Sequence, residues 1–190
     1  MELLLGIFTA FGLSASAGLN AYIPLLVVGV IAHYTDWIIL SNPWDLLANP
    51  WVLIVLGILV IIEMLADKIP AVNHLNDAIQ TFVRPAAGAI AFAASAKVIT
   101  DIHPMLALIS GLLVAGGVHA IKSVAVRPAV TATTGGAGNI PVSIAEDIFS
   151  TVVSILAIVV PIIVAIVLVL TIALFILWRL RRREKTNQHI

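Results

Sequence analysis

Residues 84–96 read RPAAGAIAFAASA, a run of small side chains that begins directly after an arginine. Small residues let transmembrane helices approach one another closely. We therefore expect residues 85–100 to form the central and most enclosed helix of a membrane bundle. The next apolar stretch, residues 104–126, carries several glycines and alanines for the same kind of contact. The short turn between the two stretches predicts a helical hairpin.

The composition of the whole chain is typical of an integral membrane protein. Of its 190 residues, 61% are hydrophobic and 11% are charged, and the mean hydropathy is +1.13. We expect a single integral membrane domain, residues 1–190. The formal net charge of zero gives no basic surface for nucleic acid, and the lack of cysteine excludes disulfides and thiol chemistry.

The first apolar segment, residues 3–32, is longer than the roughly 20 residues that a spanning helix needs. It lacks the positive region and cleavage site of a signal peptide, so we expect it to stay in the membrane. Gly18, Asn20 and Pro24 lie together inside it, and a straight helix is therefore not expected. A tilted, kinked helix and a broken helix both remain open.

Two further elements precede the small-residue run. Residues 51–67 predict a second apolar helix, which starts after Asn49 and Pro50 in the positions of an N-cap and first helical residue. Residues 71–83 are too polar to span and predict a short amphipathic helix, at the interface or inside the bundle.

The second half of the chain ends in a long apolar stretch. Residues 131–141 are rich in Thr, Gly and Ala, and we expect them to dip into the protein as a re-entrant loop. Ser143 and Glu146 have the spacing of a capping box, which predicts a helix from Ser143 to residue 180 with a kink at Pro161. The segments together predict an all-α polytopic membrane helix bundle with about five to six membrane segments, some of them broken or re-entrant.

Charged and amide side chains interrupt these apolar segments, and charge near membrane depth indicates a functional site. Arginine and lysine could bind an anionic group, amides at helix breaks could coordinate a solute, and carboxylates could balance charge or carry protons. The candidate binding residues are Asn20, Arg84, His119, Lys122, Arg127 and Asn139. The candidate counter-charges or proton carriers are Asp67, Asp77, Glu146 and Asp147.

Two short sequence similarities between the two halves of the chain indicate an internal repeat. Residues 17–24 resemble residues 137–141 with a gap, and Arg84-Pro85-Ala86 resembles Arg127-Pro128-Ala129. Paired, interrupted apolar segments are typical of transporters built from repeats. Chance matches among Gly, Ala and Pro are the competing explanation.

Each polar residue also has a structural interpretation. The cations could form ion pairs with the carboxylates or extend to the interface, and His119 could be a packed helix residue as well as a proton relay. No HExxH-type spacing is present, so we expect no metal and no cofactor. The order of Lys122 and Arg127-Pro128 is faintly similar to membrane lipid phosphatases, but the spacing differs and no Ser-Gly-His nucleophile region occurs, which argues against an enzyme.

The polar segments that interrupt the apolar stretches closely resemble those of a family of small bacterial integral membrane proteins known as domain of unknown function 4126. The resemblance covers the chain from Gly18 to the basic tail, with Asn73 where the family is expected to carry an aspartate. The residues that carry it are Asp67-Lys68-Ile69-Pro70, His74, Asp77, residues 81–89, His119, Lys122, Arg127-Pro128, residues 131–136, Asn139 and Glu146-Asp147. The family implies which residues belong together and implies no activity.

We therefore expect a bacterial inner-membrane, multi-pass protein that passes a small polar or anionic solute, with or without proton coupling. A membrane scaffold or lipid-interacting protein is the second hypothesis, and a membrane enzyme acting on a lipid head group is the third. The expected partners are the bilayer and the solute, without nucleic acid, and homo-oligomers are an option. A basic tail at residues 179–190 predicts a cytoplasmic C-terminus. Its cations are Arg179, Arg181, Arg182, Arg183 and Lys185.

Overall fold

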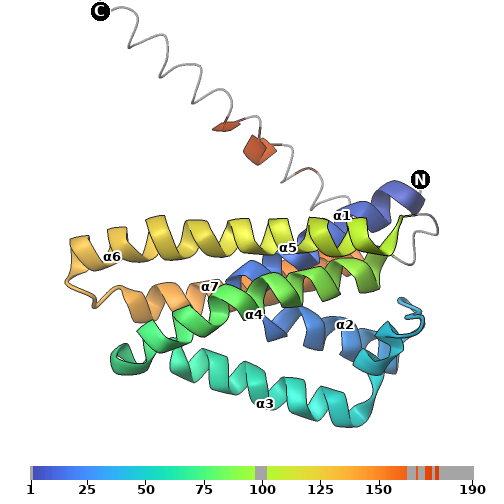
Figure 1. Ribbon diagram of the computed structural model, residues 1–190, viewed down its shortest axis with the longest axis horizontal. Coiled ribbons are helices and arrows are strands. Elements are labelled where there is room, and N and C mark those ends of the chain that lie inside the picture. The colour runs from blue at the N-terminus through green and yellow to red at the C-terminus, as the bar shows by residue number, and fades with distance from the viewer. Residues whose placement is uncertain (1, 97–101, 162–165, 167–169, 173, 176–190) are drawn as a thin grey trace, which may run out of the picture.

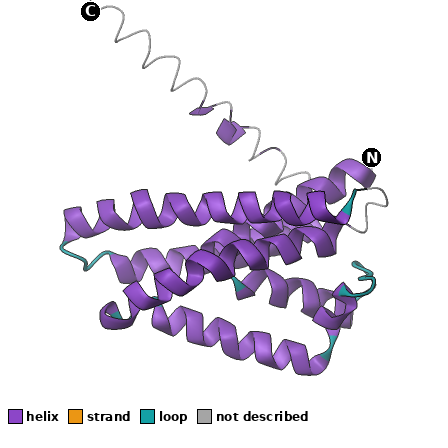
Figure 2. Ribbon diagram, in the orientation of Figure 1, coloured by secondary structure: helices purple, strands orange, loops and turns teal. Residues whose placement is uncertain are grey.

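The protein is a bundle of helices that lie roughly along one long axis (Figures 1 and 2). The computed structural model describes residues 2–96, 102–161, 166, 170–172 and 174–175. Over these residues there is no strand, so the all-α fold class is confirmed. The elements are α1 (Glu2–Leu19), α2 (Tyr22–Tyr34), the 3-10 helix η1 (Trp44–Ala48), α3 (Pro50–Ala66), α4 (Pro70–Ala96), α5 (Pro104–Ile121), the π-helix η2 (Lys122–Val126), α6 (Arg127–Thr134) and α7 (Asn139–Val159).

The first apolar segment folds back on itself. α1 enters the bundle beside α7, and α2 returns to the end from which α1 came (Figure 1). The backbone N–H of Ala21 contacts Glu63 near the end of α3, whereas Gly29 lies against Leu47 just before α3 begins. α2 therefore runs antiparallel to α3. Of the two arrangements left open for residues 3–32, the broken helix is correct, and its two parts form a hairpin.

Asn20 explains where this hairpin turns. Its Oδ1 accepts hydrogen bonds from the N–H groups of Tyr22 and Ile23, both at 3.2 Å. Amide side chains of this kind satisfy the free donors at a helix start. Pro24 follows in the first turn of α2, where its missing N–H has no cost.

α4 is a single helix that continues through Pro85, and the predicted division between residues 71–83 and 85–100 is wrong. The ring of Pro85 lies beside Gly116 of α5, where there is room for it. Beyond it, residues 87–95 are buried except for Ile90, which is half-buried. A Cβ added to Gly88 would lie 2.2 Å from the Cβ of Ala115. Small side chains thus allow the close contact between α4 and α5 that the sequence predicted.

The expected re-entrant loop at residues 131–141 is not present. Helix continues from Pro104 to Thr134, and the chain reverses in a short turn where Gly135 and Gly136 have φ values of 62° and 93°. α7 begins at Asn139, so the predicted capping box is also wrong, and Ser143 lies buried inside the helix. α7 ends at Val159, before Pro161. The predicted helix beyond that point and the basic tail lie largely outside the described residues.

Two helical stretches among the described residues are long and apolar enough to cross a membrane, Pro104–Thr134 and Asn139–Val159. Three shorter helical stretches are also apolar: Leu5–Leu19, Tyr22–Tyr34 and Pro50–Ala66. α4 carries its polar residues in its first half and its buried small residues in its second half. Buried polar side chains gather inside the bundle, near the tip of the α1–α2 hairpin.

Candidate functional site

Eight charged side chains form a charge cluster inside the bundle. Four are acidic and four are basic. Six of them share six ion pairs, and Lys68 and Asp147 form a seventh pair of their own. They come from α3 and the turn after it, α4, η2, α6 and α7, so the cluster connects most of the bundle. Its members are Glu63, Asp67, Lys68, Arg84, Lys122, Arg127, Glu146 and Asp147.

The most deeply buried pair is Arg84 of α4 with Glu63 of α3, both 0% exposed. The Nε and Nη2 of Arg84 donate to one carboxylate oxygen of Glu63 at 3.1 and 3.0 Å. The Nη1 lies 3.1 Å from Nδ1 of His119, whose Nε2 lies 3.3 Å from the hydroxyl of Thr81. Charge-assisted bonds of this kind are strong and hold the guanidinium in one orientation.

Asp67 is the centre of the cluster because three cations share its Oδ2. Arg127 lies at 3.1 Å, Lys122 at 3.3 Å and Arg84 at 3.4 Å. Its other oxygen accepts a hydrogen bond from Asn76 at 2.7 Å. One carboxylate therefore orients three cations that come from α4, η2 and α6.

The two acidic residues of α7 occupy opposite sides of the cluster. Glu146 contacts Lys122 at 2.8 Å and Arg127 at 3.1 Å. Asp147 accepts hydrogen bonds from Lys68 and Asn20, both at 3.0 Å. Consecutive residues of a helix point about 100° apart, which is why neighbours in sequence reach different partners.

The cluster also satisfies the backbone at the tip of the α1–α2 hairpin. Lys122 donates to the carbonyl of Leu19, at the end of α1, at 3.1 Å. The N–H of Ala21, where α2 begins, donates to the carboxylate of Glu63 at 3.0 and 3.3 Å. A helix has partial negative charge at its C-terminus and partial positive charge at its N-terminus. Lysine and glutamate therefore have the signs that the two helix ends require.

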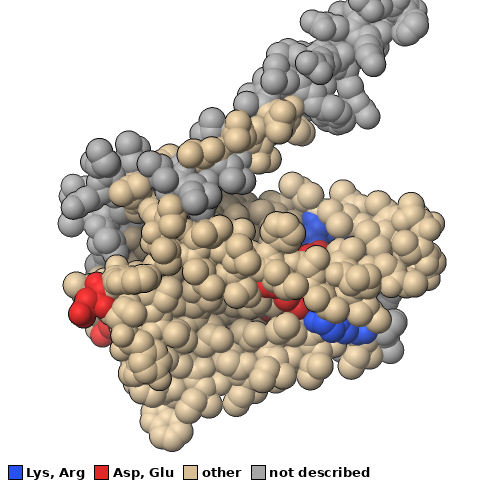
Figure 3. All heavy atoms as spheres, turned by 180° about the vertical axis from the view of Figure 1, so that it is seen from behind, with Lys and Arg blue, Asp and Glu red and all other residues tan. Residues whose placement is uncertain are grey.

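Two apolar grooves reach this cluster from the surface, one on each side of α7. The groove between α2, α3 and α7 has a volume of about 360 Å³ and reaches Asp147. The groove between α1, η2 and α7 has a volume of about 330 Å³ and reaches Lys122 and Glu146. Figure 3 shows acidic and basic atoms exposed together near the middle of one face, apart from a separate acidic group at its edge. Lys68, whose side chain is 23% exposed, is the most accessible cation of the cluster.

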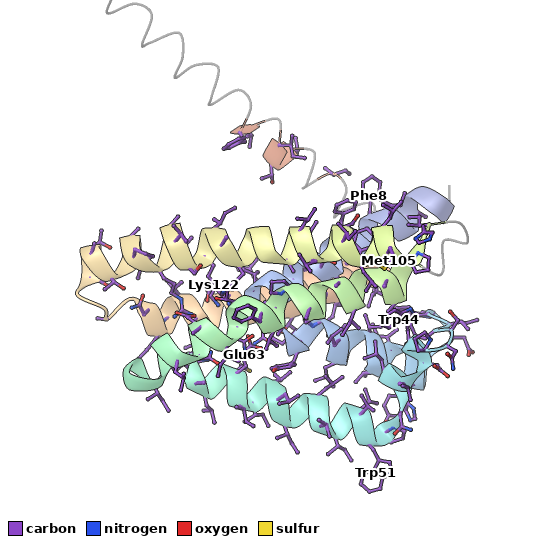
Figure 4. The ribbon with its side chains drawn as sticks, in the orientation of Figure 1. Phe8, Trp44, Trp51, Glu63, Met105 and Lys122 are labelled. Carbon is purple, nitrogen blue, oxygen red and sulfur yellow. The ribbon has the colours of Figure 1, made fainter. Side chains whose placement is uncertain are left out.

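The structure brings together most of the residues that the sequence singled out. Figure 4 shows Lys122 and Glu63 inside the bundle, while Trp51 points outward. Arg84 and Arg127, which each begin one of the two similar Arg-Pro-Ala segments, both contact Asp67. The predicted residues that lie in the cluster or bond to it are Asn20, Asp67, Arg84, His119, Lys122, Arg127, Glu146 and Asp147.

Two predicted residues lie elsewhere. Asn139 lies at a helix break, the α6–α7 turn, as Asn20 lies at the α1–α2 turn. Its side-chain amide donates to Thr131 at 2.9 Å, and among the described residues no hydrogen bond joins it to the charge cluster. Asp77 is half-buried, and it has no ion pair among the residues that the structure describes. Its backbone carbonyl accepts a hydrogen bond from Thr81.

The sequence interpretation missed Glu63, Lys68 and Asn76. Glu63 had a signal, because it is the only charge inside the apolar helix α3 and lies four residues before Asp67, on the same face. Asn76 gave no such signal in the sequence, because a single amide on an amphipathic helix usually faces solvent. Among the described residues, no group of three or more His, Asp or Glu side chains is placed to hold a metal ion.

Comparison with known proteins gives one result. A family model described as "Domain of unknown function (DUF4126)" matches residues 7–182, nearly the whole chain and all eight charged residues of the cluster. No curated protein and no solved structure matches the chain.

Proposed function

The chain belongs to the family described as Domain of unknown function (DUF4126), and from its own residues we propose that it is a membrane transporter for a small anionic solute, coupled to proton movement. In this proposal it is a single-domain, multi-pass protein of a bacterial inner membrane. α3, α4, the α5–α6 stretch and α7 cross the bilayer, and the α1–α2 hairpin is re-entrant. The basic tail from residue 179 lies on the cytoplasmic side.

One observation carries the proposal: the α1–α2 hairpin ends inside the bundle, and charged side chains bind its two open helix ends. Backbone that leaves regular helix at membrane depth is tolerated where it is buried in protein or lines a cavity. Transporters use such helix ends near the bilayer midplane to bind ions and substrates. Lys122 at Leu19 and Glu63 at Ala21 match that arrangement.

Glu146 is the carboxylate that a solute would replace. It lines the groove on the α1 side of α7, and its Oε2 accepts from both Lys122 and Arg127. In the proposed cycle a proton from water binds Glu146, and the two cations turn their N–H donors to the oxygens of an entering carboxylate or phosphate. When the solute leaves, Glu146 releases the proton and the ion pairs form again. One proton therefore moves with each anion.

The test uses purified protein in liposomes that contain the pH-sensitive dye pyranine. An inward gradient of succinate or of inorganic phosphate should acidify the interior in liposomes with protein, and not in protein-free liposomes. Arg127→Ala should abolish this acidification. Ser123→Ala is the matched control, because Ser123 lies on the neighbouring π-helix, is half-buried and bonds only to the carbonyl of Ala120 among the described residues, and it should behave as the parent protein. The absence of acidification with both anions would contradict the proposal.

The second candidate is a membrane scaffold without translocation, and the complete pairing of the cluster favours it. All four cations of the cluster have a carboxylate within 3.4 Å, as a purely structural network requires. A scaffold predicts that the main effect of Arg127→Ala is a loss of stability, because the ion pairs of Arg127 with Asp67 and Glu146 then serve only the fold. Thermal unfolding of the purified variant in detergent separates the two candidates.

A further inference from the structure

Three serine hydroxyls meet between α1 and α7, next to the charge cluster. Ser16 of α1 lies 2.7 Å from the hydroxyls of both Ser150 and Ser154 of α7. All three residues are 0% exposed. We call these three residues the serine cluster.

The serine cluster continues a polar face of α7 that includes the charge cluster. Ser143, Asp147, Ser150 and Ser154 are spaced by four, three and four residues, which places them on one side of the helix. Asn20, one turn after Ser16 on α1, bonds to Asp147. The hydroxyl of Ser143 is fully buried and has no hydrogen-bond partner among the described residues. A buried hydroxyl without a partner is costly and requires an explanation, such as a transient ligand.

The polar contact between the two helices extends beyond the serines toward the N-terminus of α1. The hydroxyl of Thr9 donates to the carbonyl of Ala157 at 2.7 Å, one turn of α7 after Ser154, and Thr9 is half-buried. From Ser143 to Ala157 the helix rises about 21 Å. The polar face therefore runs from the buried Asp147 toward the half-buried Thr9. Among the described residues no hydrogen bond joins the Asp147 carboxylate to the serine cluster, and none joins Ser154 to Thr9.

We propose that the serine cluster is the middle section of a proton path between Asp147 and the end of the bundle at which α1 begins, with transient water molecules carrying the proton from Asp147 to Ser150 and from Ser154 to Thr9. A hydroxyl both accepts and donates a hydrogen bond, so it can take a proton on its oxygen and pass its own proton to the next oxygen. Each such step leaves the hydroxyl unchanged after it rotates. Oxygens 2.7 Å apart leave no space for a hydrated ion between them, whereas a proton needs none. The path rests on the proposed proton coupling, in which Glu146 takes up the proton, and it begins at Asp147, the carboxylate next to Glu146 in the sequence of α7.

Interhelical packing is the competing explanation, because serines often bond across membrane helices. The chain contains a matched example of that role. Ser14 lies on α1 two residues before Ser16, is equally buried, and donates to the carbonyl of Gly88 on α4 at 2.8 Å. It faces away from α7 and has the same chemistry, so Ser14→Ala measures what the loss of one buried hydroxyl does to the fold alone.

The experiment compares two activities in the same proteoliposomes. Pyranine reports acidification driven by a succinate gradient, which needs net proton transfer. Exchange of radiolabelled succinate across the membrane at equal pH needs binding but no net proton transfer. Ser16→Ala and Ser150→Ala should slow acidification by on the order of 100-fold, the scale of a lost proton-transfer group, and leave exchange intact. Ser150→Thr keeps a hydroxyl and should restore acidification, and Ser14→Ala should change neither activity.

Any other result contradicts the proposed proton path. If both alanine variants acidify at the parent rate, the path is wrong and the transporter stands. If they lose exchange together with acidification, the serines serve packing. If the parent protein shows neither activity, the proposed function fails and the path fails with it.

Discussion

The tip and the flank of the α1–α2 hairpin are held in the bundle by different forces. Charged side chains bind the tip, where Lys122 and Glu63 contact the backbone of Leu19 and Ala21. The flank depends on close approach, since a Cβ added to Gly18 would lie 2.5 Å from the Cβ of Val118. Small residues in close contact can pack in only one arrangement. Ion pairs that share partners can form several arrangements, and five charges here have two or three partners each: Asp67, Arg84, Lys122, Arg127 and Glu146. A site that must change state needs this second kind of contact.

The largest expected effect is the loss of the deepest charge. Arg84→Ala leaves Glu63 buried without its cation and should lower the free energy of unfolding by about 3–5 kcal/mol. Titration with SDS in mixed micelles measures it. The double variant Glu63→Ala with Arg84→Ala should lose less than the sum of the two single variants, because neither charge is then left alone. If the two losses of stability add up, the interaction free energy between Glu63 and Arg84 is zero.

The close contact between α4 and α5 should also respond to side-chain volume. Gly88→Ala places a Cβ 2.2 Å from the Cβ of Ala115 and 2.9 Å from the carbonyl of Gly111, so the helices must separate. We expect a loss of about 1–3 kcal/mol in the same titration.

Gly57→Ala is the matched control for this substitution. Gly57 lies within α3 with no atom near an added Cβ, and alanine there should stabilise the helix by up to about 1 kcal/mol. Equal effects at the two glycines would mean that α4 and α5 are not in close contact.

Arg127→Ala should cost less than Arg84→Ala, although both arginines contact Asp67. Lys122 also contacts both carboxylates that Arg127 contacts, Asp67 and Glu146, so neither loses its last cation. We expect about 1–3 kcal/mol, the scale of hydrogen bonds to charged groups, with complete loss of succinate-driven acidification. A loss of stability as large as that of Arg84→Ala would favour the scaffold.

The sequence predicted the close contact between α4 and α5 better than the tip of the α1–α2 hairpin, and the reason is physical. Close packing at Gly88 follows from side-chain size, which is a local property of the sequence. Pro85 was expected to end a helix, but whether a proline breaks a membrane helix depends on its neighbours, here Gly116. A chain reversal inside the bundle was expected at residues 131–141 and occurs at Asn20, because two glycines with positive φ at residues 135 and 136 made an ordinary turn sufficient at the first place.

Charge pairing could be predicted only in outline. The balance of signs in the polar segments indicated that they meet, and Arg84, Arg127 and Asp67 do meet. The partners of each charge depend on helix rotation and depth, to which the sequence gives no access. Glu63 was overlooked for this reason, since its role depends on the position of a hairpin tip that belongs to another segment.

The smallest expected effect is at Asn139, which the repeat hypothesis paired with Asn20. Asn20 bonds to Asp147 and to the first turn of α2, whereas the amide of Asn139 bonds only to Thr131 among the described residues, at a turn that is largely exposed. Asn139→Ala should therefore change the free energy of unfolding by no more than about 0.5 kcal/mol, as a surface substitution does, and leave acidification at the parent rate. Asn20→Ala leaves two donors of α2 without their acceptor and should lose both stability and acidification. If Asn139→Ala instead abolishes acidification in folded protein, the α6–α7 turn belongs to the transport site and the two halves of the chain are functional counterparts after all.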